Sequence, residues 1–126
     1  MIVIPKFDAW VRDSLNIVDD PLLKEYIVGV LLDVVNSKIS VDESLTLMLI
    51  DGIDKRNFSL LQRTGDAALW NMIMFPTTNF EVARNVGRTA YKNCHVILNG
   101  SFKLYEVLSC DLVDITRTVR QAIVIR

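Results

Sequence analysis

Residues 57–74 read NFSLLQRTGDAALWNMIM and carry apolar side chains almost all the way round a helix. Leu61, Gly65, Ala68 and Met72 recur at helical spacing and form one side. Much of the remaining circumference is covered by five further apolar residues: Leu60, Leu69, Trp70, Ile73 and Met74. A helix that is apolar on all sides is normally buried, whereas a surface helix keeps one polar face. We therefore expect this helix at the centre of the fold.

The segments on both sides also show helical spacing of their apolar residues. They predict helices over about residues 5–16, 21–36, 40–52, 78–99 and 101–108, with a last helix from about residue 110. Only residues 1–4 and 122–125 read as short strands, which is too little for a sheet-based domain. Short connections favour antiparallel neighbours. The sequence therefore predicts an all-α fold, a compact antiparallel bundle of about six or seven helices, with residues 1–126 as one domain.

Several of these helix ends carry recognisable signals. Ser40–Glu43 and Thr78–Glu81 each have the spacing of a capping box, in which two side chains satisfy free amide groups of the first turn. Gly52 and the pair Asn99-Gly100 are expected to end helices, because these residue types accept the left-handed conformation after the last turn.

The composition fits a soluble protein that folds without a partner. Hydrophobic residues make up 51% and charged residues 23% of the 126 residues, unlike disordered chains. A net charge of −1 provides no overall positive field, so nucleic acid is not expected as a partner. No signal-like segment opens the chain, and the apolar run 26–32 is too short to span a bilayer. With only two cysteines, we expect a cytoplasmic protein without membrane contacts.

The charges are unevenly distributed along the chain. Residues 1–54 carry four Lys or Arg against ten Asp or Glu, a net charge of −6. Residues 55–126 carry ten Lys or Arg against five acidic residues, a net charge of +5. Two interpretations stay open: the halves pack against each other through complementary helix faces, or copies of the chain associate head to tail.

Asp66 lies midway along the most apolar helix, where an unpaired carboxylate must find a partner or take up a proton. If the helix over residues 78–99 packs against this one, partners can come from a set of four residues: Arg63, Arg84, Arg88 and Tyr91. Asp66 is then either a buried polar tie between two helices or the carboxylate of a ligand pocket. The candidate ligand-binding residues are Arg63, Asp66, Trp70, Arg88 and Tyr91.

Two glycines interrupt these helices. Glycine costs about 1 kcal/mol relative to alanine inside a helix, so packing or ligand space must compensate at Gly65. Gly87 could face it and allow a tight crossing of the two helices.

A basic stripe runs along the helix over residues 78–99. It consists of Arg84, Arg88, Lys92 and His95, which are spaced i, i+4, i+8 and i+11 and therefore share one strip of the helix. The stripe is either a solvated helix face or a surface that grips a phosphate-rich ligand or an acidic partner.

Recognisable catalytic and metal sites are missing from the pattern. His95 is the only histidine, which excludes a multi-histidine metal site. Cys94 precedes it directly, but adjacent helical residues point about 100° apart and cannot act as nucleophile and base. Cys94 also shares a strip with apolar residues, so we expect a core thiol. We predict no catalytic residue, no metal and no cofactor, although an enzyme is not strictly excluded.

Three motifs together resemble a known family. They are Glu25-Tyr26 before an apolar run, the segment 60–70 with Arg63-Thr64-Gly65-Asp66, and Gly87-Arg88-Thr89-Ala90-Tyr91; Phe75-Pro76 lies between the last two. The pattern Arg-x-Gly-Asp-x-x-Leu-aromatic, Phe-Pro, Gly-x-x-Ala-Tyr is similar to that of a family of small, uncharacterised, all-helical bacterial proteins. The resemblance implies a helical fold and a bacterial source, and it implies no activity.

These observations favour a non-catalytic helical protein that acts through protein–protein contacts, with a homodimer as the leading hypothesis. The alternative is a small-ligand-binding protein with a pocket between the helices over residues 57–74 and 78–99. The expected partner is thus another protein or a second copy, and a small molecule stays open.

Overall fold

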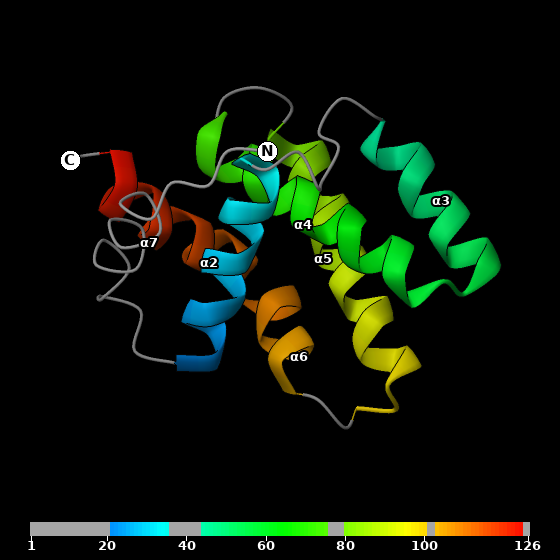
Figure 1. Cartoon of the computed structure of the whole chain (residues 1–126). Coiled ribbons are helices and arrows are strands. Elements are labelled where there is room, and N and C mark those ends of the chain that lie inside the picture. The colour runs from blue at the N-terminus through cyan, green and yellow to red at the C-terminus, as the bar shows by residue number, and fades with distance from the viewer. Residues whose placement is uncertain (1–20, 36–43, 76–79, 101–102, 125–126) are drawn as a thin grey trace.

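The computed structural model describes residues 21–35, 44–75, 80–100 and 103–124. All regular structure in these ranges is α-helical: α2 (Pro21–Val35), α3 (Leu45–Lys55), α4 (Phe58–Met74), α5 (Phe80–Ile97), α6 (Lys103–Cys110) and α7 (Leu112–Val124). The prediction of an all-α bundle is confirmed (Figure 1). The helix expected over residues 5–16 and the strand expected over residues 1–4 lie outside the described residues.

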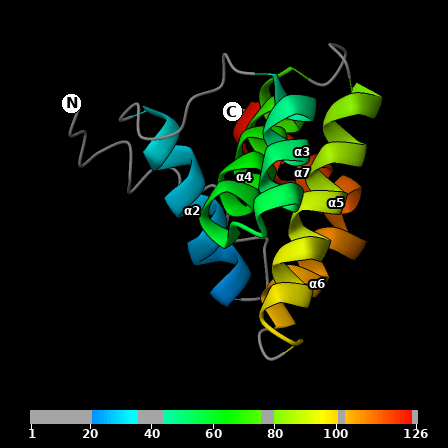
Figure 2. The same ribbon diagram turned by 90° about the vertical axis from the view of Figure 1, so that its right-hand side faces the viewer.

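The helices α4 and α5 form the centre of the bundle. They run antiparallel, since Gly65 lies against Tyr91, while Ala68 further along α4 lies against Gly87 further back in α5. The helix α3 packs on both of them, α2 packs on α4, and α6 packs on α5. The helix α7 contacts α4, α5 and α6. In Figures 1 and 2, α2 and α3 lie on different sides of the central pair.

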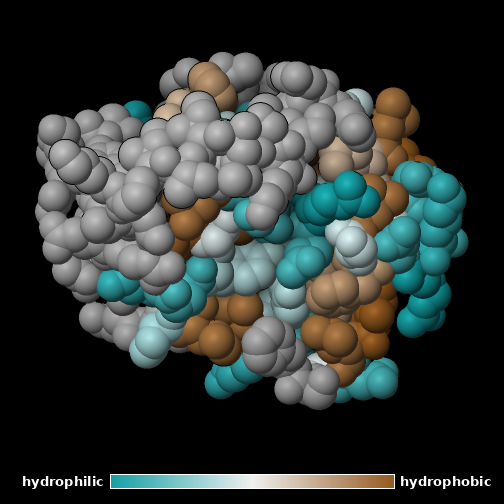
Figure 3. Space-filling view, in the orientation of Figure 1, coloured by the Kyte–Doolittle hydropathy of each residue, from teal (hydrophilic) through white to brown (hydrophobic). Residues whose placement is uncertain are grey.

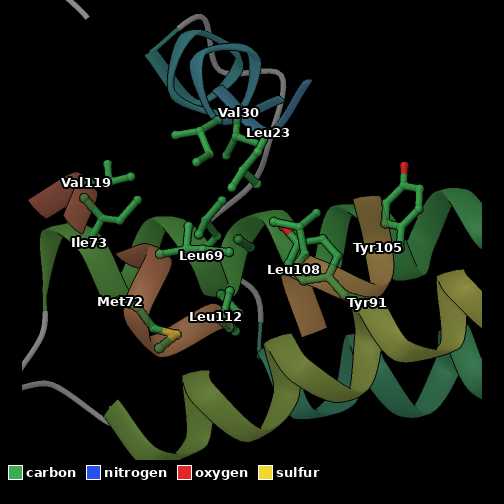
Figure 4. Close-up of a cluster of buried hydrophobic side chains, with 14 of the residues drawn as sticks. Leu23, Val30, Leu69, Met72, Ile73, Tyr91, Tyr105, Leu108, Leu112 and Val119 are labelled. Atoms are coloured by element: carbon green, nitrogen blue, oxygen red, sulfur yellow. The ribbon is translucent and has the colours of Figure 1, made fainter. Parts of the chain in front are cut away.

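The core confirms the central position expected for α4. Nine of its residues are buried: Leu61, Thr64, Gly65, Asp66, Ala67, Ala68, Leu69, Met72 and Ile73. Side chains from α2, α6 and α7 converge on this helix, among them Leu23, Val30, Leu108, Leu112 and Val119 (Figure 4). Each fully buried aliphatic side chain contributes about 2 kcal/mol relative to an exposed one. This convergence is the main source of stability.

Helices α3 and α4 each begin with a side-chain cap. The Asn57 Oδ1 accepts a hydrogen bond from the Leu60 amide at 3.1 Å, so α4 begins where the sequence predicts it. The Ser44 Oγ accepts from the Leu47 amide at 3.4 Å and caps α3. The start of α3 expected at residue 40 is wrong, because the helix begins at Leu45 after Ser44, whose backbone is extended. Residues 40–43 and 78, on which the expected capping boxes depend, lie outside the described residues.

The expected end of α3 at Gly52 is wrong. Gly52 lies inside the helix, which continues to Lys55 and ends at Arg56 in the left-handed conformation, with φ of 47°. A Cβ at position 52 would lie 2.9 Å from Leu61 Cδ2, so this glycine provides close packing of α3 on α4. The end expected at Asn99-Gly100 is confirmed, since α5 ends at Ile97 and both residues, which follow Leu98, have positive φ.

The short strand expected over residues 122–125 is also wrong over its described part. Residues 122–124 belong to α7, because the helical spacing of Leu112, Ile115 and Val119, all buried in the core, extends the helix through them. None of the described helices combines the length and the apolar character needed to cross a membrane.

Candidate functional site

The side chain of Asp66 ties three helices together. It lies midway along α4, with 8% of its surface exposed. Its Oδ1 accepts a hydrogen bond from the Tyr26 hydroxyl in α2 and another from the Tyr91 hydroxyl in α5, the latter at 2.7 Å. Two donors offset much of the cost of burying a carboxylate. The predicted tie between two helices is therefore present, and it includes a third.

Burial changes the ionisation of all three groups. Loss of hydration raises the pKa of Asp66 to about 6, although the hydrogen bonds from Tyr26 and Tyr91 act in the opposite direction. Burial and the adjacent carboxylate raise the pKa of both tyrosines above their ordinary value. Near neutral pH the two phenols are therefore protonated donors to an ionised Asp66.

Aromatic rings surround this cluster. The rings of Tyr26 and Tyr91 meet edge to face with centroids 6.2 Å apart, and Tyr26 meets Tyr105 in the same way at 6.0 Å. The Tyr105 hydroxyl accepts a hydrogen bond from Gln62 at 2.8 Å rather than bonding Asp66. Such packing excludes water and fixes the ring positions.

The thiol of Cys94 is a core group, as predicted. It is fully buried, and burial raises its pKa to about 12, with Asp66 adding to the effect. A thiol that stays protonated at neutral pH is a poor nucleophile.

Among the described contacts, none of the other candidate ligand-binding residues donates a hydrogen bond to Asp66. The side chain of Arg63 is exposed to solvent. Trp70 is half-buried and packs against the hydrophobic core. Arg88 Nε donates to the Ser109 carbonyl oxygen at 3.1 Å. The structure therefore joins Asp66 to Tyr91, and it adds Tyr26, which the sequence named only within the motif Glu25-Tyr26.

The predicted crossing of Gly65 on Gly87 is wrong. A Cβ at Gly65 would lie 2.6 Å from Tyr91 Cε1, whereas a Cβ at Gly87 would lie 2.7 Å from Leu112 Cδ2 and 3.1 Å from Ala68 Cβ. Each glycine thus accommodates a different side chain, and the space beside Gly65 is filled by an aromatic ring.

The basic stripe divides into two kinds of environment. Arg84 Nη2 lies 3.8 Å from Glu81 Oε1, and His95 Nε2 lies 3.7 Å from Glu106 Oε2. Arg88 and Lys92 instead line a polar groove, together with Asn85, Thr89 and Ser109. Ser109 comes from α6, so the groove depends on a contact that the helical spacing of α5 does not predict.

Within the described ranges, no group of three or more His, Cys, Asp or Glu side chains could hold a metal ion. Comparison of the chain with protein-family models, curated proteins and solved structures gave no match.

Proposed function

We propose that this protein acts through protein–protein contacts and forms a homodimer through the outer face of α3. The observation that carries the proposal is a row of exposed aliphatic side chains on this helix. Leu47, Ile50 and Ile53 expose 67%, 50% and 40% of their surface and form what we call the α3 apolar stripe. Met48 and Gly52 lie on the opposite face and are buried.

The position of α3 suits an interface. The helix lies at one side of the bundle in Figure 1, and hydrophobic and hydrophilic residues adjoin along that side of the surface in Figure 3. Single exposed aliphatic residues are common on soluble proteins, but three spaced by three residues on one helix form a contiguous surface. A contiguous apolar surface favours contact with another protein.

The charges beside the stripe are compatible with a second copy in antiparallel orientation. Asp51 and Asp54 are exposed next to the stripe, and Lys55 Nζ lies 3.0 Å from Asp51 Oδ1. Around a two-fold axis at Ile50, Asp54 of one copy would lie opposite Thr46 of the other, and Asp51, which would lie beside the axis in both copies, is already paired with Lys55. An 11-residue helix is about 16 Å long. The outer face of a helix this short buries less surface than the standard interface of about 800 Å² per partner. The proposed dimer is therefore a dissociable one.

Replacing Ile50 by glutamate is expected to abolish the dimer. The substitution places a carboxylate from each copy near the two-fold axis, where both would lose water and repel each other. Sedimentation velocity over a hundredfold range of concentration should show a monomer for Ile50→Glu and a monomer–dimer equilibrium for the parent protein.

Val82→Glu is the matched control, because Val82 is similarly exposed (46%) but lies on α5. This variant should dimerise like the parent protein. A parent protein that sediments as a monomer at every concentration would refute the proposal, as would equal weakening by both substitutions. Unchanged helical circular dichroism in both variants excludes unfolding as the cause.

A further inference from the structure

We propose that the groove between α5 and α6 binds a tetrahedral oxyanion, either inorganic phosphate or the phosphate group of a small molecule. This site is separate from the α3 apolar stripe and does not depend on dimer formation. The groove is lined by Asn85, Arg88, Thr89, Lys92 and Ser109 and has a volume of about 310 Å³. That volume is at the lower end of the range for small-ligand sites.

The chemistry of the lining favours an anion. Arg88 and Lys92 contribute two positive charges, one helical turn apart. Asn85 and Thr89 add an amide and a hydroxyl that can donate hydrogen bonds. Among the described residues that line the groove there is no carboxylate. A local charge of +2 therefore exists on a chain whose net charge is −1.

Arg88 is held in place before any ligand arrives. Its Nε donates to the carbonyl oxygen of Ser109 at 3.1 Å, and the Ser109 hydroxyl donates to the Arg88 carbonyl oxygen at 3.0 Å. Ser109 is itself buried. This reciprocal pair joins α5 to α6 and fixes the base of the guanidinium. The bond uses Nε, while the two terminal nitrogens of a guanidinium can still grip two oxygens of a phosphate. Because the side chain is already ordered, binding loses less conformational entropy.

The surroundings favour a small anion over a polyanion. Glu81 and Glu106 are exposed on the same two helices, and each lies near a basic residue outside the groove lining. An extended nucleic acid would have to pass these carboxylates, whereas one phosphate group contacts only the groove. Arg88 and Lys92, the two middle members of the basic stripe, are exposed along the groove, and their paired charges suit a single oxyanion.

The test is a titration of the 126-residue chain with inorganic phosphate at low ionic strength, followed by calorimetry and by amide chemical shifts. We expect saturable binding, with the largest shifts at Arg88, Lys92 and Ser109. Lys92→Gln should weaken phosphate binding about tenfold, the usual effect of one lost charge-assisted hydrogen bond. Lys92 is exposed, so this change should leave the fold intact.

Lys103→Gln is the charge-matched control, because Lys103 is exposed at the start of α6 and does not line the groove. It should bind phosphate like the parent protein. Arg88→Lys keeps the positive charge but removes the guanidinium that can bind two phosphate oxygens, so it should weaken phosphate binding. Thermal unfolding of this variant shows whether loss of the contact with Ser109 destabilises the fold. A phosphate monoester such as glycerol 3-phosphate that binds more tightly than phosphate would identify a small molecule as the source, and equal affinity would identify the free ion.

Three results would overturn the proposal: no saturable phosphate binding, equal weakening by Lys92→Gln and Lys103→Gln, or displacement of phosphate by a DNA duplex at far lower concentration than by the monoester. The dimer variant Ile50→Glu should bind phosphate normally. Loss of dimerisation and loss of phosphate binding are therefore distinguishable failures.

Discussion

Replacing Gly65 by alanine is expected to destabilise the protein by about 2 kcal/mol, although alanine is the better helix former. A Cβ at this position would lie 2.6 Å from Cε1 and 2.8 Å from Cζ of the Tyr91 ring. The ring cannot move away freely, because Tyr91 is fully buried and its hydroxyl is bonded to Asp66. Helices α4 and α5 would have to move apart to make room for the Cβ. Urea unfolding followed by circular dichroism measures the change.

Gly29→Ala is the matched control for this prediction. Gly29 also lies inside a helix, α2, but a Cβ there would meet no atom within 4 Å. Alanine should therefore stabilise the protein by about 0.5–1 kcal/mol, the ordinary difference in helix propensity. A Gly65→Ala variant as stable as the parent protein would show that the ring of Tyr91 does not define this contact.

The sequence predicts the central helix because its signal is local. Apolar residues cover nearly the whole circumference of residues 58–74, and Asn57 supplies the cap, so both position and burial follow from short-range spacing. Gly65 and Asp66 attract attention for the same reason, since both depart from that apolar pattern. The structure gives each a packing reason: close approach of an aromatic ring and a buried hydrogen-bonded tie.

The partners of these residues could not be predicted in the same way. The hydroxyl that binds Asp66 from α2 comes from Tyr26, 40 residues away, and helical spacing carries no information about which helices touch. A weak signal was present, because Tyr26 is the phenol within an otherwise aliphatic stripe, and a buried phenol needs a hydrogen-bond partner. The predictions for Gly52 and Gly87 were wrong for the same reason. Gly52 accommodates Leu61 and Gly87 accommodates Leu112, and these contacts depend on packing between segments that are distant in the sequence.

The stability of this protein is expected to contain a contribution from Asp66 that falls as the pH rises from about 4 to above 6. In the folded state the pKa of Asp66 is about 6, compared with 3.8 for an ordinary aspartate. The folded protein therefore holds this proton more tightly than the unfolded chain does, and stability decreases as the proton is lost. The difference in pKa corresponds to about 3 kcal/mol, fully present below pH 3.8 and lost as the pH passes 6. Asp66→Asn removes the titrating group, so the stability difference between the parent protein and this variant isolates the effect from that of other carboxylates.

Two further variants decide whether the phenols control this titration. Tyr91→Phe removes a hydrogen bond that favours the charged carboxylate, so the pKa of Asp66 should rise further and the loss of stability should extend to higher pH. Tyr105→Phe leaves both donors to Asp66 in place, because the Tyr105 hydroxyl accepts from Gln62 instead, and the pH range should stay that of the parent protein. Urea unfolding at a series of pH values between 4 and 8 compares all four proteins. If the stability of the parent protein and that of Asp66→Asn show the same pH dependence, Asp66 does not titrate between pH 4 and 8. The charges of Asp66, Tyr26 and Tyr91 would then stay constant over this range.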